Sequence, residues 1–128
     1  MFVLNTHLDA GRSTLDRKVR AEQLNQIFNK VKLVTSGEAL IVAGDLNLRW
    51  NDPEDRALLE NFMTGLSLKD SIGRTQSERG WAILDYILYR NGQTTSLEVI
   101  EVGEDLGFQY ENAPLSDHPA LFIKFLIN

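Results

Sequence analysis

The sequence predicts a single domain of the α/β (α+β) class that spans residues 1–128. The first observation is the order of its patterns. Strand-length apolar runs and stretches of helical period follow one another as β-α-β-α-β-β-β, which is typical of this class. The second observation is its size and composition. With 128 residues, of which 43% are hydrophobic and 24% charged, the chain fits one ordinary globular domain and is too apolar for intrinsic disorder.

The N-terminal part predicts a strand followed by a long helix. Residues 1–4 are apolar and form a short strand that ends near His7. Thr14 can cap a helix of about 20 residues, and Ser36 with Gly37 ends it, since glycine is the usual stop. The helix is indicated by apolar residues that recur at steps of three to five positions: Leu15, Val19, Leu24, Ile27, Phe28, Val31 and Val34.

A second strand and a second helix are predicted next. Residues 39–43 are continuously apolar, which is typical of a strand buried on both faces, and the run stops abruptly at Gly44-Asp45. Asp52 then marks a helix start as the N-cap, with Pro53 at the first helical position. Gly65 ends this helix, whose apolar stripe consists of Leu58, Leu59, Phe62 and Met63.

The C-terminal half predicts three further strands. Residues 66–80 form a long loop, and loops of this length in compact domains are often functional. A tight turn is expected at Asn91-Gly92, and an acidic loop at 103–115. The strands themselves are expected at 82–89, 97–102 and 120–127.

Composition excludes several classes of function. The net charge is −5, with 13 Lys and Arg against 18 Asp and Glu. This excludes binding to nucleic acid through bulk positive charge, but not a nuclease that contacts phosphate locally through a metal ion. The absence of cysteine excludes disulfide scaffolds and thiolate metal sites, and it leaves the compartment open. The apolar runs are shorter than the ~18 residues of a membrane span, and no signal peptide is visible after Met1.

Polar side chains gather at the ends of the predicted strands. Ligands of open α/β sheets bind at strand ends, so these side chains could form one site. Histidine moves protons near neutral pH, and aspartate supplies oxygen ligands for Mg²⁺ or Ca²⁺. The four clusters are Asn5-Thr6-His7-Leu8-Asp9, Gly44-Asp45-Leu46-Asn47-Leu48, Leu84-Asp85-Tyr86-Ile87-Leu88 and Ser116-Asp117-His118-Pro119.

Each cluster taken alone also has a purely structural explanation. His7 can be a hydrogen-bonded structural histidine, Asp45 can start a turn, and residues 116–119 can be a plain turn before the last strand. Asp85 is harder to explain in this way, because its neighbours are apolar and a buried carboxylate needs a partner. A structural role for all four clusters together is much less expected than for any one of them.

Together, the clusters resemble the motifs of a known family. Gly44-Asp45-Leu46-Asn47, Leu84-Asp85-Tyr86-Ile87 and Ser116-Asp117-His118-Pro119 resemble, in that order, the closing motifs of the endonuclease/exonuclease/phosphatase superfamily. Asn5-Thr6-His7-Leu8 resembles its middle histidine motif. This is the deoxyribonuclease-I-like fold, shared by base-excision repair nucleases, neutral sphingomyelinases, inositol polyphosphate 5-phosphatases and deadenylases. The four motifs span nearly the whole chain.

The resemblance implies a metal-dependent phosphoester hydrolase, of the phosphodiesterase or nuclease type, that works by in-line attack of water. His118 corresponds to the catalytic histidine, and Asp85 to the carboxylate that orients and polarises it. Asp45 corresponds to the group that positions or deprotonates the attacking water, with Asn47 beside it. His7 corresponds to a donor to the phosphate in the transition state.

The resemblance also implies a metal site. Asp117 and Asp45 correspond to its carboxylates, and the expected ion is Mg²⁺, or Mn²⁺ or Ca²⁺ in its place. The family carries a metal-binding Glu before the histidine motif, whereas here only six residues precede His7 and none is acidic. The isolated chain is therefore expected to be weak or inactive.

The chain is accordingly expected to correspond to the C-terminal half of a family domain. That half of the four-layer αββα sandwich is one mixed sheet of about five strands with two helices on one face. Its other face would be left apolar. Cover for it is expected from a homodimer or from the missing N-terminal half.

The substrate is expected to be a phosphoester in a nucleic acid, a phospholipid or a small phosphodiester. Arginine can hold phosphate, and tryptophan can stack on a base or enter a lipid interface. Equally, the arginines near the first helix can form its solvated face, and the tryptophans can pack over the edge of the core. The alternatives are a phosphatase, a sphingomyelinase-like lipid phosphodiesterase, and a non-catalytic binding or assembly module. The candidate substrate contacts are Asn5, Arg12, Arg74, Arg79, Trp50 and Trp81.

Overall fold

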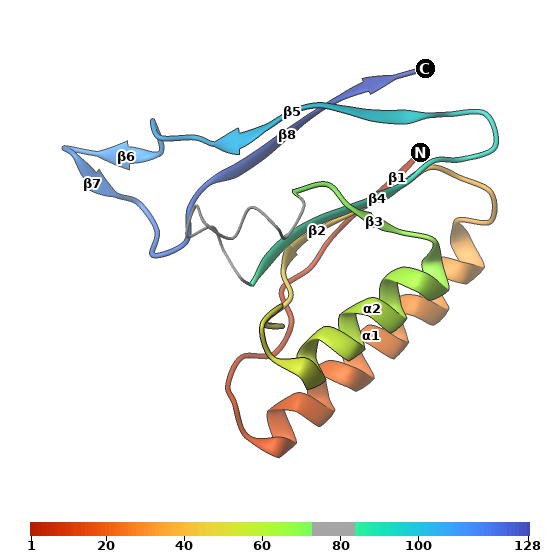
Figure 1. Ribbon diagram of the computed structural model, residues 1–128, viewed down its shortest axis with the longest axis horizontal. Coiled ribbons are helices and arrows are strands. Elements are labelled where there is room, and N and C mark those ends of the chain that lie inside the picture. The colour runs from red at the N-terminus through yellow and green to blue at the C-terminus, as the bar shows by residue number, and fades with distance from the viewer. Residues whose placement is uncertain (73–83) are drawn as a thin grey trace.

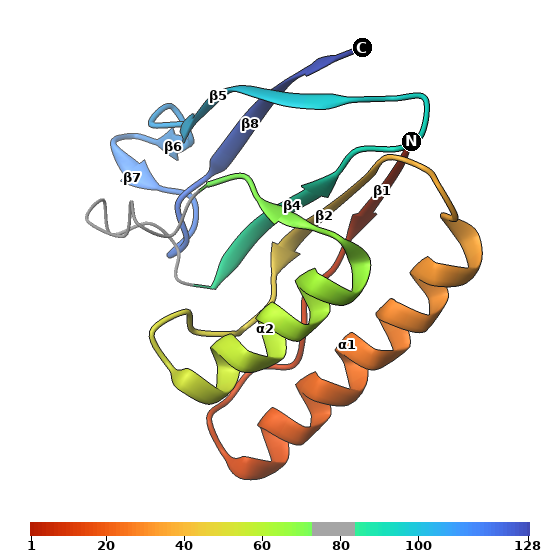
Figure 2. The same cartoon turned by 45° about the vertical axis from the view of Figure 1, so that its right-hand side comes forward.

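A computed structural model describes residues 1–72 and 84–128 as a mixed sheet with two helices on one face (Figures 1 and 2). The helices are α1 (Thr14–Val34) and α2 (Pro53–Leu66). The four strands run in the order β1-β2-β4-β3, with β1 parallel to β2 and the other pairs antiparallel. Their bounds are β1 Phe2–Asn5, β2 Leu40–Asp45, β3 Lys69–Asp70 and β4 Asp85–Arg90. The predicted fold class is confirmed.

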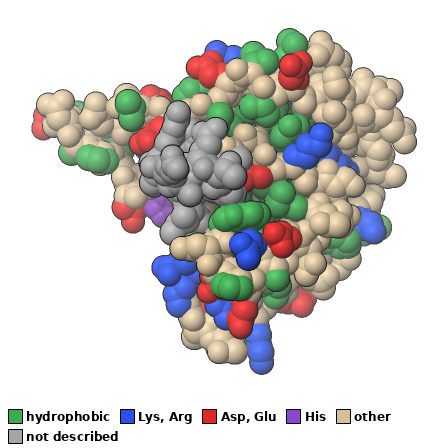
Figure 3. Space-filling model, viewed as in Figure 1, with side chains coloured by type: hydrophobic (Ala, Val, Ile, Leu, Met, Phe, Trp, Pro, Cys, Tyr) green, Lys and Arg blue, Asp and Glu red, His purple; other side chains and the backbone are tan. Residues whose placement is uncertain are grey.

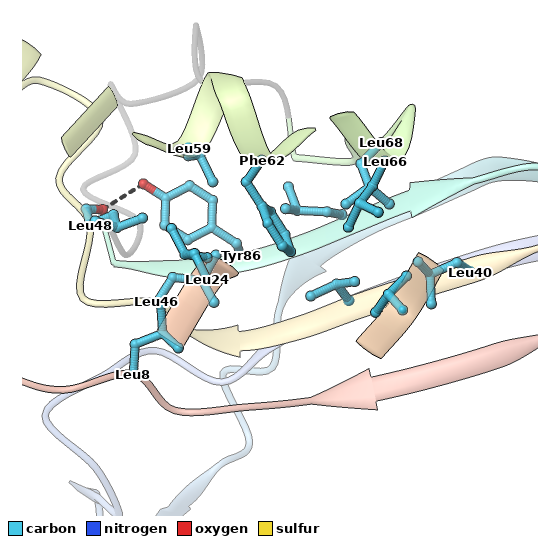
Figure 4. Close-up of a cluster of buried hydrophobic side chains, with 13 residues drawn as sticks. Leu8, Leu24, Leu40, Leu46, Leu48, Leu59, Phe62, Leu66, Leu68 and Tyr86 are labelled. Carbon is cyan, nitrogen blue, oxygen red and sulfur yellow. Dashed lines mark hydrogen bonds between the residues drawn. The ribbon is translucent and has the colours of Figure 1, made fainter. Parts of the chain in front are cut away.

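The core lies between the helices and one face of the sheet. Alternate residues of β2 and β4 point toward the helices, because successive side chains of a strand face opposite sides. From the sheet these are Leu40, Val42, Tyr86 and Leu88, all almost fully buried. The helices cover them with Leu24, Val31, Leu59, Phe62 and Leu66, part of the cluster shown in Figure 4.

The last long strand lies outside the four-stranded sheet. β5 (Leu97–Glu104) and β8 (Leu121–Ile127) pair antiparallel as a separate two-stranded ribbon. Figure 1 shows this ribbon on the side of the sheet away from the helices, and the Tyr89 ring on β4 lies 5.2 Å from the Phe125 ring on β8. The main sheet thus has four strands in place of about five, and the ribbon covers part of the face that was expected to be open.

Both helices begin at capping residues. The N-cap of α1 is Ser13, one residue before the predicted Thr14, and it forms a capping box with Asp16. The N-cap of α2 is Asp52, as predicted, and it accepts from the backbone N–H groups of Glu54 and Asp55. Within the described residues, neither helix combines the length and the apolar character that crossing a bilayer requires.

The predicted apolar stripe of α1 is only partly buried. Leu24 and Val31 are buried, whereas Leu15 and Val34 are exposed. Arg20 is fully buried at 0% exposure, whereas the two alternatives for the arginines near this helix, phosphate binding and a solvated face, both place them at the surface. Its spacing from Leu24 is one helical turn, so it lies on the same face as the buried leucine.

Two segments predicted as loops contain short strands. β3 lies in the loop predicted at 66–80, and the acidic loop predicted at 103–115 contains a small hairpin of β6 (Gln109–Tyr110) and β7 (Ala113–Pro114). Residues 73–83 lie outside the described residues. The predictions for the rest of this loop and for the first residues of the strand at 82–89 therefore fall outside the described residues.

Arg90, at the end of β4, ties the C-terminal ends of the two helices together. Its guanidinium donates to the carbonyl of Thr35 at 2.6 Å, after α1, and to the carbonyl of Leu66 at 3.0 Å, at the end of α2. It also donates to the carbonyl of Glu38 at 3.3 Å. The last carbonyls of a helix lack intrahelical partners and carry partial negative charge, so one cation satisfies both ends.

We expect Arg90→Met to lower the free energy of unfolding by about 2–4 kcal/mol, because several carbonyls lose a charged donor at once. Urea denaturation followed by circular dichroism measures this. Arg56→Met is the matched control, since Arg56 is an exposed arginine of α2, and its effect should stay within about 0.5 kcal/mol. Equal effects of the two substitutions would show that the contacts of Arg90 add nothing.

Candidate active site

Backbone pairing beyond the ends of β1 and β2 brings two predicted site residues together. The N–H of Thr6 donates to the carbonyl of Ala43 at 3.0 Å, and the N–H of Leu8 donates to the carbonyl of Asp45 at 2.9 Å. His7 lies between these two contacts. Its Nε2 is 3.5 Å from the Oδ2 of Asp45, and the histidine side chain is 71% exposed. The parallel pairing therefore places a solvent-facing imidazole beside the carboxylate that ends β2.

Asn47 shapes the loop that follows β2. Its backbone adopts the left-handed conformation, with φ 51°, which asparagine tolerates better than most residues. Its N–H donates to Asp45 Oδ1 at 2.8 Å, and its side-chain amide donates to the carbonyl of Leu8 at 2.9 Å. The Tyr86 hydroxyl donates to the carbonyl of Leu48 at 2.6 Å (Figure 4). The asparagine side chain is thus buried and joins the loops after β1 and β2.

The antiparallel pairing of β2 with β4 sets two carboxylates opposite each other. Asp45 and Asp85 are register partners at the same end of the sheet. His118, which precedes β8 in the chain, places its Nδ1 2.7 Å from Asp85 Oδ2 and 3.9 Å from Asp45 Oδ2. The contact between Asp85 and His118 that the sequence predicted is therefore present. All three side chains are partly buried.

The Asp85 contact determines the protonation chemistry of His118. A carboxylate only accepts hydrogen bonds, so Nδ1 carries the proton, and the neutral imidazole then has its lone pair on Nε2. The hydrogen bond to Asp85 is the main cause that raises the pKa of His118 above its ordinary value, against burial, which lowers it. The negative charges of Asp45 and Asp117 act in the same direction as Asp85.

We expect Asp85→Asn to lower the pKa of His118, because the substitution removes both the accepting carboxylate and its charge. The measurement is an NMR titration of the imidazole protons in a metal-chelating buffer, and the chain has only two histidines to assign. In the unsubstituted chain, protonated His118 stabilises the fold, and this stabilisation is fully present at pH values below the histidine pKa of the unfolded chain, about 6.5. That stabilisation is lost as the pH rises through the folded pKa. An unchanged His118 titration in the variant would contradict the assignment.

Carboxylate and imidazole atoms lie close enough here to hold a metal ion. Each of Asp45, Asp85 and His118 offers one ligand atom, and these atoms lie within 4.8 Å of one another. Two carboxylates suit a hard cation such as Mg²⁺, which prefers oxygen ligands and retains several waters. Asp117, the other predicted metal ligand, is exposed and lies outside this group, although its charge acts on His118.

The predicted substrate contacts have varied surroundings. Asn5 is exposed at the end of β1. Arg12 donates from one nitrogen, Nη1, to the carbonyl of Asn47 and to Asp55, both at 3.2 Å, so this nitrogen is occupied by protein partners. Trp50 is partly buried against the core, as the structural alternative supposed. Arg74, Arg79 and Trp81 lie outside the described residues.

Sequence reasoning missed a buried ionic cluster beside the site. The Asp55 carboxylate is fully buried on α2 and contacts the guanidinium groups of Arg12 and Arg17, with Arg20 at 4.0 Å. The sequence presents Asp55 as one of several acids at a helix start. Only the one-turn spacing between Arg20 and Leu24 pointed to a buried arginine.

A cavity of about 470 Å³ extends from the site toward a projecting arm, residues 104–115, which contains β6 and β7. Its lining includes Asp117 and His118 at one end and Phe108 of the arm. Figure 3 shows apolar side chains along the arm and a histidine beside acidic groups at its base. The large apolar side chains exposed on the arm are Leu106, Phe108, Tyr110 and Leu115.

Comparison with curated proteins finds relatives of greater length, and no protein-family model matches the chain. A sphingomyelinase of Mycobacterium tuberculosis is 29% identical over 140 aligned positions, which cover 96% of this chain and 27% of that protein. A phospholipase C of Staphylococcus aureus is 31% identical over 111 positions, covering 82% of this chain and 33% of that protein. The chain therefore spans no more than a third of the length of these relatives.

Solved structures share the fold over nearly the whole chain. The catalytic domain of human Nocturnin, with a bound sulfate, matches with a TM-score of 0.67 and 25% identity, covering 97% of this chain and 46% of that one. An endonuclease/exonuclease/phosphatase family protein of Bacteroides thetaiotaomicron matches at 0.56 and 19%, covering 96% and 47%. A Staphylococcus aureus beta toxin variant with bound magnesium ions matches at 0.56 and 22%, covering 93% and 51%. The last two similarities concern the fold alone.

Proposed function

Because the chain carries the motifs that resemble those of the endonuclease/exonuclease/phosphatase superfamily and shares the fold, we propose that it belongs to this superfamily and carries the histidine–aspartate part of a metal-dependent phosphodiesterase site. One observation above all supports this. The Nδ1 of His118 lies 2.7 Å from Asp85 at the end of the sheet where Asp45 and His7 also lie. A histidine oriented by one carboxylate beside a second carboxylate is an arrangement suited to general-base hydrolysis.

In the proposed mechanism, water attacks the phosphorus opposite the leaving oxygen. The bond to that oxygen breaks, and the oxygen leaves as an anion that takes up a proton from the solvent. Asp45 accepts a hydrogen bond from the water and orients it, while Asn47 holds Asp45 in place through its backbone N–H. His118, oriented by Asp85, accepts the water's proton at Nε2. His7 is exposed toward solvent beside Asp45, where it can donate to a phosphate oxygen.

The metal ion is proposed to be Mg²⁺, held by Asp45 and by Asp117. The role of Asp117 is the one that the resemblance implies, since Asp117 lies outside the close group of Asp45, Asp85 and His118. The carboxylates of that group lie close to one another at an open edge and fit this ion. When bound, it supplies positive charge that offsets the negative charge developing on the phosphate.

Hydrolysis of bis-p-nitrophenyl phosphate tests the proposed reaction. We expect slow turnover that requires Mg²⁺ or Mn²⁺ and stops on chelation. It should be slow because no acidic residue precedes His7 in these 128 residues, where the resemblance places a metal-binding Glu. Turnover that persists unchanged in excess chelator would overturn the metal-dependent mechanism. A complete lack of turnover with every divalent ion, at substrate concentrations up to saturation, would overturn the assignment of activity to this chain.

Among phosphodiester substrates, the projecting arm favours a phospholipid over a nucleic acid. The arm exposes four large apolar side chains next to the cavity that reaches His118, and Leu106 is 76% exposed. Apolar side chains of this kind can enter the boundary between lipid headgroups and acyl chains. The net charge of −5 disfavours a polyanionic nucleic acid. The curated relatives, a sphingomyelinase and a phospholipase C, give further support.

Two substitutions on the arm test this substrate class. We expect Leu106→Ser with Phe108→Ser to reduce hydrolysis of sphingomyelin in vesicles by at least about tenfold, because each lost apolar contact weakens interfacial binding. Hydrolysis of the soluble substrate should change by less than about twofold, since that substrate does not depend on binding to a lipid interface. Leu33→Ser, an equally exposed leucine on α1, is the control. Equal losses on both substrates, or efficient cleavage of plasmid DNA in place of lipid, would overturn the preference.

We further propose that a second copy of the chain, or the remainder of a longer protein, covers apolar surface that the ribbon leaves exposed. The described residues expose Val3 on the edge strand β1, and Ile100, Phe122 and Leu126 on β5 and β8. Apolar side chains concentrated on sheet surfaces are typical of an interface. Light scattering at micromolar concentration distinguishes a dimer from a 14.5 kDa monomer.

A further inference from the structure

The loops after β1 and β2 are both attached to one buried carboxylate on α2. Asp55 is fully buried at 0% exposure and lies in the first turn of α2. Its Oδ2 accepts the backbone N–H of Arg49 at 3.0 Å, in the loop after β2. The same oxygen accepts from Arg12 Nη1 at 3.2 Å, in the loop after β1.

Arg12 extends this connection to the site. The nitrogen that contacts Asp55 also donates to the carbonyl of Asn47, again at 3.2 Å. Asn47 in turn donates its N–H to Asp45 and its side-chain amide to the carbonyl of Leu8, next to His7. A continuous set of hydrogen bonds therefore leads from Asp55 to the carboxylate of Asp45 and to the backbone next to His7.

The remaining partners of Asp55 explain why its carboxylate stays fixed. Arg17 donates its Nε to Asp55 Oδ1 at 3.2 Å, and the fully buried Arg20 lies 4.0 Å from the same oxygen. Arg20 also donates to the carbonyls of Asp9 and Gly11, in the loop after β1. A buried charge that has several charged donors loses much stability when it moves away from any of them.

We propose that Asp55 is a positioning residue, which holds the loops after β1 and β2 in one arrangement and thereby fixes Asp45 and Asn47 for the reaction. Its effect on loop geometry follows from the contacts alone, and its effect on catalysis rests on the proposed function. Asp55 does not meet the substrate, because its side chain is fully enclosed. A shift of about 1 Å in a reacting group can reduce a rate by about 10²-fold, so loose loops would lower kcat.

Hydrogen exchange of the backbone amides is the first test. In Asp55→Asn, we expect the Arg49 and Asn47 amides to exchange at least about tenfold faster relative to the Leu88 amide of the central strand β4. Leu66→Ala is the matched control, a fully buried residue at the opposite end of the same helix. It should accelerate all amides together. Arg12→Lys is the milder variant, since lysine keeps the charge but its ammonium lies nearer the backbone than the Nη1 atom of Arg12 that contacts Asp55 and Asn47.

Steady-state kinetics with bis-p-nitrophenyl phosphate and Mg²⁺ is the second test. We expect kcat to fall by about 10–100-fold in Asp55→Asn and by less in Arg12→Lys, with KM within about twofold. Leu66→Ala should retain kcat at temperatures where it is folded. Faster local exchange in a chain without measurable turnover would support the positioning of the loops and count against the proposed function. The inference would be overturned if the Asp55 and Leu66 variants showed the same exchange rates and the same kinetics. It would also be overturned if Arg12→Lys changed neither the exchange of the Arg49 and Asn47 amides nor kcat.

Discussion

His118→Ala is expected to reduce the metal-dependent hydrolysis of bis-p-nitrophenyl phosphate by roughly 10²–10⁴-fold, the range that a positioned general base contributes. Asp85 holds the Nδ1 of this histidine at 2.7 Å, which leaves Nε2 as the nitrogen that can take a proton. No other histidine of the chain is held in this way, because His7 is 71% exposed and its contact to Asp45 is 3.5 Å long. Stopped-time assays at saturating Mg²⁺ measure the loss.

Lys124→Met on β8 is the control for His118→Ala, since Lys124 is an exposed residue whose ion pair with Glu101 lies away from the Asp85–His118 pair. Free imidazole in the assay should restore part of the activity of His118→Ala, which a merely unfolded variant could not show.

The pH dependence provides a third measurement. The base must be neutral to accept a proton, so the rate should rise as the pH passes the raised pKa of His118. In Asp85→Asn this rise should move to lower pH. Retention of more than about a tenth of the rate by His118→Ala would remove the histidine from the mechanism.

Local sequence patterns were sufficient to predict most elements of the fold. The continuous apolar run at 39–43 became β2, and the Asp52-Pro53 pair marked the start of α2 to the residue. Both signals act over one or two turns of chain, and so they can be read without knowing the tertiary structure. The position of β8 could not be predicted in the same way. Alternation of half-buried and exposed residues, as in Leu121 to Phe125, fits a strand of the main sheet and a strand of a separate ribbon equally well.

The convergence of the site could be predicted because its polar residues stand at strand ends, which topology brings to one edge. The partners of Arg12 could not be predicted. Arg12, Arg17 and Arg20 have the same charge in the sequence, but all three lie within 4.0 Å of the buried carboxylate of Asp55, and of the three only Arg20 is itself buried. Nothing in the acidic run Asp52 to Asp55 distinguishes the buried carboxylate from the exposed one of Glu54. Burial depends on how α2 packs against α1, which is a tertiary property.

Gly44 connects the fold to the site through its backbone. It precedes Asp45, the last residue of β2, and its φ is +133°, a conformation that residues with a side chain rarely adopt. A Cβ at this position would lie 1.9 Å from the carbonyl oxygen of Thr6. That oxygen belongs to the backbone of the segment paired with β2, so it cannot turn aside as a side chain could. The close approach of these two backbone segments therefore depends on glycine.

Gly44→Ala is accordingly expected to lower the free energy of unfolding by at least about 3 kcal/mol, because backbone strain and a direct clash add together. Gly107→Ala is the control. Gly107 lies in the exposed arm without a positive φ, and its nearest contact to an added Cβ is an aspartate side-chain oxygen at 3.1 Å. Urea denaturation should show almost no change for this control.

Under conditions where Gly44→Ala is still folded, the loops after β1 and β2 must separate, and Asp45 then loses its place beside His7 and His118. Exchange of the Thr6 and Leu8 amides should accelerate before that of the core, and hydrolysis should fall with it. A Gly44→Ala chain as stable and as active as the Gly107→Ala chain would contradict the role assigned to this approach of the two loops.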